Sequence, residues 1–185
     1  MAHTESTMLE LGTIAPDFAL TDVMTGKTFA RGDFRGKKGL LVMFICAHCP
    51  YVKHIEKTLG PFFADYVSQP LGVAAIGSND ATAYPGDSPE GLKKQAQANG
   101  FTFPYLYDES QDAAHAYTAA CTPDFFLFDG DFRLVYRGQF DSSRPGNGIP
   151  VTGIDLRAAI DLVLDGKPVP TGQRPSIGCN IKWKA

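Results

Sequence analysis

The chain has 185 residues and a formal net charge of −3, with an ordinary balance of apolar and charged residues. This length predicts a single domain, residues 1–185, with a substantial core. Because the charge is slightly negative and no apolar run is long enough to cross a bilayer, we expect neither a nucleic-acid partner nor a membrane partner.

The first predicted elements follow a loose lead-in at residues 1–11. Residues 15–22 alternate between apolar and polar side chains, and a turn at 25–27 leads into a second short strand at 28–29. This pattern predicts an N-terminal hairpin. The apolar run at 39–45 then indicates a strand that is buried on both faces and pairs in parallel.

A helix is predicted directly after Cys49. Its apolar positions recur in steps of three and four, which places them on one face, and Gly60-Pro61 should kink or break it. A second buried strand is predicted at 71–77. The two strands and the helix between them form a βαβ unit, and such units are almost always right-handed. The apolar positions of this helix are Val52, Ile55, Leu59, Phe62 and Tyr66.

A polar loop at 78–87 should precede the next helix. Ser88 followed by Pro89 is typical of a helix start, and Asn99-Gly100 is typical of a helix end. Beyond it the sequence predicts a short strand at 104–107 and a helix at 109–119.

The last third should form a hairpin, a loop, a helix and a tail. The hairpin strands are predicted at 122–128 and 133–137. Thr152 and Asp155 have the spacing of a capping box and should open a helix that contains Leu156, Ile160 and Val163. The tail, residues 168–185, is apolar enough that we expect it to dock onto the body.

The segment Cys46-Ala47-His48-Cys49-Pro50 carries the strongest chemical signal. Two thiols three positions apart can close and reopen a small disulfide ring. They lie where a strand passes into a helix, and the free N–H groups and positive dipole end of a helix N-terminus stabilise a thiolate. The thiolate is the form that attacks disulfides and peroxides. The spacing therefore predicts redox chemistry.

Other interpretations of the pair are weaker. A zinc site needs two more ligands, whereas Cys121 and Cys179 stand far apart and His48 and His54 complete no regular spacing. A c-type haem site would have His where Pro50 stands. Two inert core cysteines remain the alternative. We expect no metal and no cofactor other than the redox-active disulfide itself.

The segment Met1 to Thr7 is polar and lacks the basic and apolar regions of a secretory signal. We therefore expect a cytoplasmic location. Glutathione and thioredoxin keep cysteines reduced there, so a cysteine pair is more often catalytic or sensing than a structural disulfide.

This order of elements resembles the thioredoxin fold, in the larger form shared by peroxiredoxins and the TlpA/ResA-like thiol–disulfide oxidoreductases. The resemblance is carried by Ala15-Pro16-Asp17-Phe18, by the cysteine pair after the first central strand, by an insert at 78–120, and by Thr122-Pro123 just before a strand. The chain also resembles bacterial thioredoxin-family proteins that carry Cys-x-His-Cys-Pro and a Gly-Cys-x-Ile-Lys-Trp tail. The resemblance implies an α/β fold with a central mixed sheet flanked by helices, an N-terminal hairpin and an inserted strand–helix unit.

The resemblance also implies roles for individual residues. Cys46, expected nearest the helix start and most exposed, would be the attacking thiol, and Cys49 the resolving thiol. His48 would tune the redox balance of the pair. Pro123 would be cis and would place the backbone of Thr122 beside the sulfurs, where a substrate chain could pair with it.

The remaining cysteines, Cys121 and Cys179, are candidates for additional redox thiols. Cys121 directly precedes Thr122-Pro123 and is otherwise expected to be a small buried hydrophobe. Cys179 either reaches the site as a third thiol or packs within a docked tail.

Three activities stay open at this point. The first is a thiol–disulfide oxidoreductase. The second is a peroxidase in which Cys49 is peroxidatic and Cys46 resolving, although the motif Pro-x-x-x-Thr-x-x-Cys-Pro then has Val42 and Cys46 in place of its first Pro and its Thr. The third is a non-catalytic redox sensor. The partners would be protein or small-molecule disulfides or peroxides, with electrons from a reductant of the thioredoxin or glutathione type.

Overall fold

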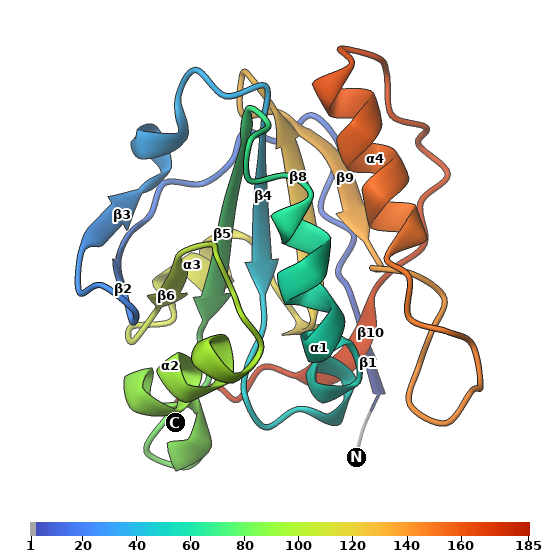
Figure 1. The fold of residues 1–185 in the computed structure, drawn as a ribbon. Helices are drawn as coiled ribbons and strands as arrows, with labels where there is room; N and C mark the ends of the chain where they lie inside the picture. The colour runs from blue at the N-terminus through green and yellow to red at the C-terminus, as the bar shows by residue number, and fades with distance from the viewer. Residues whose placement is uncertain (1–2) are drawn as a thin grey trace.

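The structure, a computed structural model, describes residues 3–185. A seven-stranded mixed sheet forms its centre, in the order β3-β2-β6-β5-β4-β8-β9, and a separate three-stranded sheet has the order β1-β10-β7 (Figure 1). The strands of the large sheet are β2 (Ala19–Asp22), β3 (Thr28–Ala30), β4 (Gly39–Phe44), β5 (Leu71–Gly77), β6 (Tyr105–Tyr107), β8 (Asp124–Asp129) and β9 (Leu134–Gly138). Those of the small sheet are β1 (His3–Glu5), β7 (Cys121–Thr122) and β10 (Ile177–Asn180).

Helices cover both faces of the large sheet. They are α1 (Pro50–Ala64), α2 (Pro89–Ala98), α3 (Asp112–Ala116) and α4 (Ile154–Leu164), with short 3₁₀ turns at Arg31–Phe34 and Pro85–Asp87. Side chains of α1, α2 and α4 join one hydrophobic core, and those of α3 join the other. This arrangement is the α/β fold that the sequence predicts.

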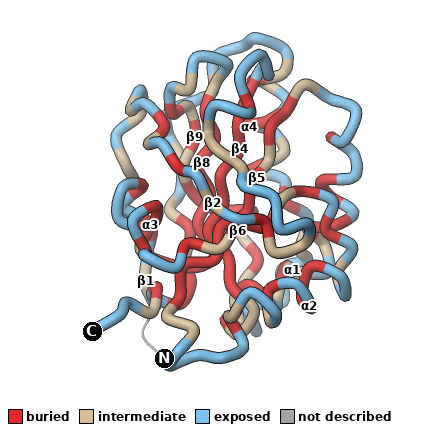
Figure 2. Tube along the Cα trace, turned by 90° about the vertical axis from the view of Figure 1, so that its left-hand side faces the viewer, coloured by how far each residue is buried: buried red, intermediate tan, exposed pale blue. Residues whose placement is uncertain are grey.

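The central strand β4 shows why the sheet is buried on both faces. Leu41 and Met43 point into the core beneath α1 and α4, whereas Leu40, Val42 and Phe44 point into the core on the opposite face. Successive residues of a strand face opposite sides, so a continuous apolar run fits a strand covered on both sides. Figure 2 shows the buried residues gathered along these central strands, with exposed segments around the outside.

Pairing in the sheet confirms the predicted βαβ unit. β4 pairs in parallel with β5, and β5 in parallel with β6, whereas β4 and β8 are antiparallel. The predicted hairpins β2–β3 and β8–β9 are also present. Among the described residues, no helix is long and apolar enough to cross a membrane.

Of the kink or break predicted at Gly60-Pro61, the break does not occur, because α1 continues through Pro61 to Ala64. A proline inside a helix costs one backbone hydrogen bond, and packing of the apolar face offsets that loss. The presence of glycine at position 60 has a separate explanation, because a Cβ there would lie 2.2 Å from the carbonyl oxygen of Asn99. The close approach of the two segments therefore needs glycine.

Two other predicted helix features differ. The helix expected at 109–119 is confined to α3, which begins after Gln111 and ends before Thr118, both in the left-handed region with φ of 67° and 51°. The predicted capping box of α4 is absent, and Gly153 occupies the N-cap without a side-chain bond. Instead, the Asp141 carboxylate accepts the N–H groups of Thr152 and Gly153, each at 2.6 Å. The predicted cap at Ser88 is confirmed, since its hydroxyl accepts the N–H of Gly91.

The two ends of the chain meet in the small sheet. The lead-in predicted as loose is a strand over His3–Glu5, which pairs with β10, and residues 1–2 lie outside the described residues. β10 in turn pairs with β7, so the tail docks as predicted. The strand expected at 122–128 is therefore divided at Pro123, with β7 in the small sheet and β8 in the large one.

Candidate active site

The cysteine pair lies where β4 ends and α1 begins. Cys49 is the N-cap residue of α1, and Cys46 lies three residues before it in the connecting loop. Both side chains are fully buried. The expectation that Cys46 is exposed and nearest the helix start is therefore wrong: Pro50 sets the first turn of the helix, so the residue at its start is Cys49.

Thr122 and Pro123 face the two sulfurs. The peptide bond between them is cis, as the resemblance predicts. The Cys46 Sγ lies 3.3 Å from the Thr122 hydroxyl, and the Cys49 thiol lies 3.2 Å from the Thr122 carbonyl oxygen, to which it donates when protonated. The structure thus brings together four of the predicted site residues, Cys46, Cys49, Thr122 and Pro123.

Hydrogen bonds make Cys49 the more acidic thiol. The Cys46 thiol is its strongest stabilising neighbour. The Cys179 thiol, the Val52 N–H and the Thr122 hydroxyl add to the effect against the cost of burial, and the pKa of Cys49 falls to about 5. The Thr122 carbonyl favours the protonated form, but these donors and the helix N-terminus outweigh it.

Cys46 is held in the protonated state. Its hydrogen bond to Cys49, its burial and the nearby Asp87 carboxylate together raise the pKa of Cys46 well above its usual value. The two thiols thus share one proton, with the negative charge on Cys49.

Asp87 organises the loop between the cysteines, although its sequence neighbourhood predicts only a polar loop. Its carboxylate accepts the N–H groups of Ala47 at 2.7 Å and His48 at 3.2 Å, together with the Asn79 amide at 2.9 Å. It also bonds the Nδ1 of His48, whose ring stacks on Tyr84 with 4.9 Å between centroids. Nothing in a single sequence links position 87 to the cysteines.

The carbonyl of Cys46 is held from the other side of the loop. Gln95 donates to it at 3.0 Å and to the Glu56 carboxylate at 2.9 Å. The buried Tyr105 hydroxyl donates to the Gln95 side-chain oxygen at 3.0 Å. These bonds fix the loop, so the position of Cys46 depends on α2 and β6 as well as on β4.

Three groups here have the chemistry of metal ligands. The Cys46 sulfur, a His48 ring nitrogen and an Asp87 oxygen lie within 4.8 Å of one another, and they are the one such group among residues 3–185. However, the Asp87 oxygens already accept bonds from three different residues. A metal would have to displace those donors, so this set does not fit one.

The other two cysteines lie on either side of the site. Cys179 pairs with Thr122 in the β10–β7 ladder, and its thiol is one of the neighbours that lower the pKa of Cys49. The Cys121 thiol instead contacts the Pro123 carbonyl at 3.6 Å, and burial raises its pKa far above the usual value. Cys179 therefore belongs to the site.

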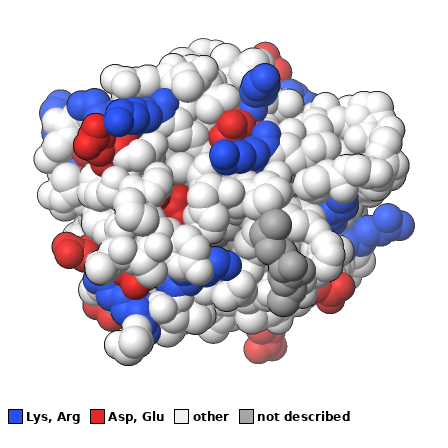
Figure 3. All heavy atoms as spheres, turned by 90° about the horizontal axis from the view of Figure 1, so that it is seen from below, with Lys and Arg blue, Asp and Glu red and all other residues white. Residues whose placement is uncertain are grey.

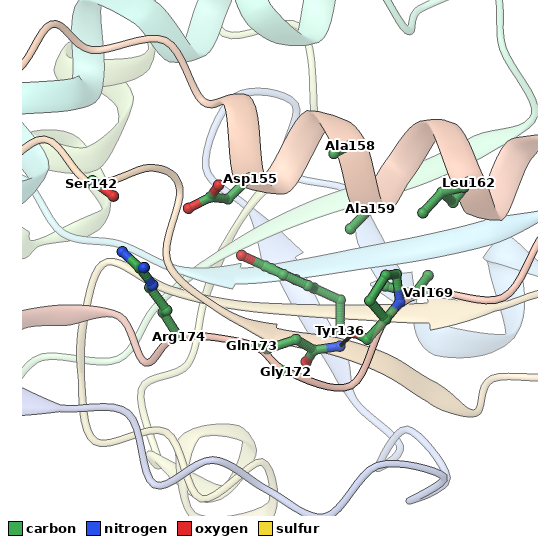
Figure 4. Close-up of a pocket in the computed structure, with 11 residues that line it drawn as sticks. Tyr136, Ser142, Asp155, Ala158, Ala159, Leu162, Val169, Gly172, Gln173 and Arg174 are labelled. Carbon is green, nitrogen blue, oxygen red and sulfur yellow. Dashed lines mark hydrogen bonds between the residues drawn. The ribbon is translucent and has the colours of Figure 1, made fainter.

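Neither sulfur of the pair is open to solvent, because Cys46 and Cys49 are both fully buried. Beside Pro123 a hollow of about 20 Å³ is lined by Tyr51, Arg144 and Ser176. A larger cavity of about 400 Å³ lies between α4, β9 and the segment 169–174, and it contains no cysteine (Figure 4). The end of the molecule toward which β4 points carries scattered charges of both signs (Figure 3). The structure therefore presents an enclosed thiol site.

The AhpC/TSA family matches residues 11–137, which is more than half of the chain. The chain belongs to the AhpC/TSA family. Two curated relatives of this chain are named thiol–disulfide oxidoreductase ResA. That of Geobacillus kaustophilus strain HTA426 is 28% identical over 137 residues, or 73% of this chain and 74% of the relative. That of Geobacillus thermodenitrificans strain NG80-2 is 28% identical over 126 residues, covering 68% and 67%. These relatives support the predicted oxidoreductase class.

Solved structures agree with the fold. An uncharacterized conserved protein from Geobacillus kaustophilus is 54% identical, with a TM-score of 0.97 over 100% of this chain and 97% of that one. A hypothetical protein from Sinorhizobium meliloti 1021 is also 54% identical, with a TM-score of 0.96 over 98% and 99%. A putative thiol:disulfide interchange protein DsbE from Chlorobium tepidum is 20% identical, with a TM-score of 0.66 over 84% and 99%, and shares the fold. The chain thus has the thioredoxin-like fold of the redoxin branch.

Proposed function

We propose that this protein is a thiol–disulfide oxidoreductase that cycles a disulfide between Cys46 and Cys49. The observation that supports it best is that both sulfurs contact the same residue at the start of α1: the Cys46 Sγ lies 3.3 Å from the Thr122 hydroxyl and the Cys49 Sγ 3.2 Å from the Thr122 carbonyl oxygen. A pair already in contact needs little movement to form a disulfide. Because the thiolate is the nucleophile, the acidity of one member gives the pair a defined order of reaction.

In this proposal Cys49 attacks and Cys46 resolves, the reverse of the order that the resemblance implies. The Cys49 thiolate attacks a substrate disulfide, forms a mixed disulfide and releases one substrate thiolate. Cys46 then loses its proton and attacks the Cys49 sulfur, which closes the Cys46–Cys49 bond and releases the second thiolate. Two electrons from an external thiol reductant of the thioredoxin or glutathione type restore both thiols. His48 bonds Asp87, and a ring nitrogen of His48 and an oxygen of Asp87 both lie within 4.8 Å of the Cys46 sulfur, so this pair would take up the proton.

The test is to trap the mixed disulfide. With the resolving thiol removed, the attacking thiol stays bonded to the substrate. Because Cys179 also neighbours Cys49, the trap removes both possible resolving thiols: Cys46→Ser combined with Cys179→Ser should accumulate a mixed disulfide with glutathione at Cys49, and Cys49→Ser should accumulate none. Trapping in Cys49→Ser alone would restore Cys46 as the attacking thiol. If the wild type neither reduces oxidised glutathione nor exchanges a model protein disulfide, the proposed function is refuted.

A second candidate is a thiol peroxidase with Cys49 peroxidatic and Cys46 resolving. It is favoured by the acidic Cys49 at the start of α1 and by the enclosed site, which suits a small oxidant better than a protein chain. Against it, Val42 and Cys46 replace two groups of the peroxidase motif. Consumption of hydrogen peroxide faster than exchange with disulfides, retained in Cys46→Ser and lost in Cys49→Ser, would favour the peroxidase.

A cytoplasmic location belongs to the same proposal. A reducing compartment would supply the electrons and keep the buried thiols reduced between cycles. Fractionation of cells that produce the full chain tests it, since recovery outside the cytoplasm would require another reductant.

A further inference from the structure

The C-terminal tail lies along the edge that a substrate chain would use. β10 pairs antiparallel with β7, with Cys179 opposite Thr122 and Asn180 opposite Cys121. The two backbones are so close that a Cβ at Gly178 would lie 2.0 Å from the Thr122 carbonyl oxygen. An extended peptide that adds a strand to a sheet needs a free edge, and here the chain itself supplies the strand.

Further contacts hold the tail on both sides of Cys179. The Ser176 hydroxyl donates to the Pro123 carbonyl at 2.6 Å, and the Lys182 N–H donates to the Asn79 side-chain oxygen at 2.8 Å. Trp183 stacks on His115, with 4.2 Å between ring centroids. At the bottom of Figure 1, β10 lies beside the start of α1. Cys179 is therefore held at the site by neighbours on each side.

The register brings a third sulfur to Cys49. Cys179 lies opposite Thr122, whose carbonyl oxygen is 3.2 Å from the Cys49 sulfur, and the Cys179 and Cys49 thiols are near enough to shift each other's pKa. Cys46 contacts Cys49 as well. Cys49 thus has a thiol partner from the loop before it and another from the tail.

We propose that Cys179 is a second disulfide partner of Cys49, so that the oxidised protein moves one disulfide between the Cys46–Cys49 and Cys49–Cys179 positions. The proposal rests on the proposed Cys46–Cys49 cycle. In the exchange the Cys179 sulfur attacks the Cys49 sulfur, the Cys49–Cys179 bond forms and the Cys46–Cys49 bond breaks. The proton that leaves Cys179 goes to the released Cys46 thiolate. The exchange needs no external oxidant, because the disulfide is only relocated.

The electrostatics of the site favour this exchange after oxidation. Burial and the neighbouring Cys49 raise the pKa of Cys179 to about 12 in the reduced protein, whereas Lys182 opposes the rise. Once Cys49 is in a disulfide its negative charge is gone, so one cause of the raised pKa disappears. The relocated disulfide would also tie the tail to α1 across the site.

The test maps disulfides in the full-length protein. Cleavage after Lys and Arg, except before Pro, places the cysteines on three separate peptides: 39–53 with Cys46 and Cys49, 95–133 with Cys121, and 158–182 with Cys179. The protein is oxidised with a small excess of diamide, the remaining thiols are alkylated, and the unreduced digest is analysed by mass spectrometry. Cys46→Ser prevents the Cys46–Cys49 bond and leaves Cys49 free for Cys179.

The oxidised Cys46→Ser protein should give peptide 39–53 joined to 158–182 as its main disulfide product. The join should persist when Cys121→Ser is added and be lost entirely when Cys179→Ser is added. In the wild type, the joined peptide should coexist with an internal disulfide in 39–53.

The proposal is overturned if Cys46→Ser keeps Cys49 as a thiol, or joins it to Cys121 or to a second chain. Circular dichroism of each variant before oxidation establishes that it is folded. If a variant does not fold, the answer comes from the wild type, as the ratio of the joined peptides to the internal disulfide in 39–53. If the wild type forms no disulfide within 39–53, the proposed function fails instead.

Discussion

Replacing Gly178 with alanine should detach the tail and expose the cysteine pair. A Cβ at this position would lie 2.0 Å from the Thr122 carbonyl oxygen and 2.6 Å from its carbon, whereas real Cβ atoms essentially never come within 3.0 Å of such atoms. Both obstructing atoms belong to the backbone and have no other rotamer. β10 and β7 must therefore move apart by about 1 Å for the alanine to fit.

The energetic cost follows from this overlap. Overpacking in a well-packed region costs about 1–3 kcal/mol. The tail can open locally without unfolding the central sheet, so the cost should appear mainly as a larger population of the detached tail. At about 1.4 kcal/mol per factor of ten, that population rises by roughly 5- to 150-fold.

The assay is the rate at which iodoacetamide alkylates Cys49, followed on peptide 39–53 by mass spectrometry. Cys49 is buried, so its alkylation requires opening of the site and should accelerate by the same factor in Gly178→Ala. Trp183, the only tryptophan, reports independently, because loss of its stacking on His115 should change its fluorescence. Gly172→Ala is the matched control, since nothing lies within 4 Å of a Cβ there.

The outcome that would refute this reasoning is specific. If Gly178→Ala unfolds at lower denaturant concentration than the wild type, yet Cys49 is alkylated within a factor of about two of the wild-type rate, the tail does not cover the site.

Three further predictions concern ionisable groups. Ultraviolet absorbance should show the Cys49 thiolate titrating near its pKa of about 5, and a titration midpoint near 8.5 would contradict this. The thiolate stabilises the fold fully above the unfolded thiol pKa of about 8.5, and this stabilisation should be lost as the pH falls through 5. Asp87→Asn should lower the pKa of Cys46, measured by pH-dependent alkylation in Cys49→Ser, because a nearby negative charge is removed. Burial raises the pKa of Asp124 to about 7, so the folded protein keeps a proton that the unfolded chain releases. The free energy of unfolding should therefore fall by at most about 4 kcal/mol as the pH rises from about 4 to 7. If urea unfolding of Asp124→Asn has the same pH dependence as that of the wild type, Asp124 is not the cause.

Local patterns predicted much of the fold. The apolar runs at 39–45 and 71–77 and the helical periodicity after Cys49 correspond to β4, β5 and α1. The position of the cysteine pair between strand and helix was also readable, because it depends on residues adjacent in the chain. Burial repeats with the period of each element, so the sequence alone reveals which elements form and which faces they bury.

The closed state of the site was decided by tertiary structure. Asp87 lies about forty residues from the loop whose N–H groups it accepts, and Cys179 reaches Cys49 only because β10 pairs with β7. The burial of both sulfurs follows from the same packing. Contacts between distant segments depend on strand register and on how loops cover a sheet, and no periodicity within a segment records either one.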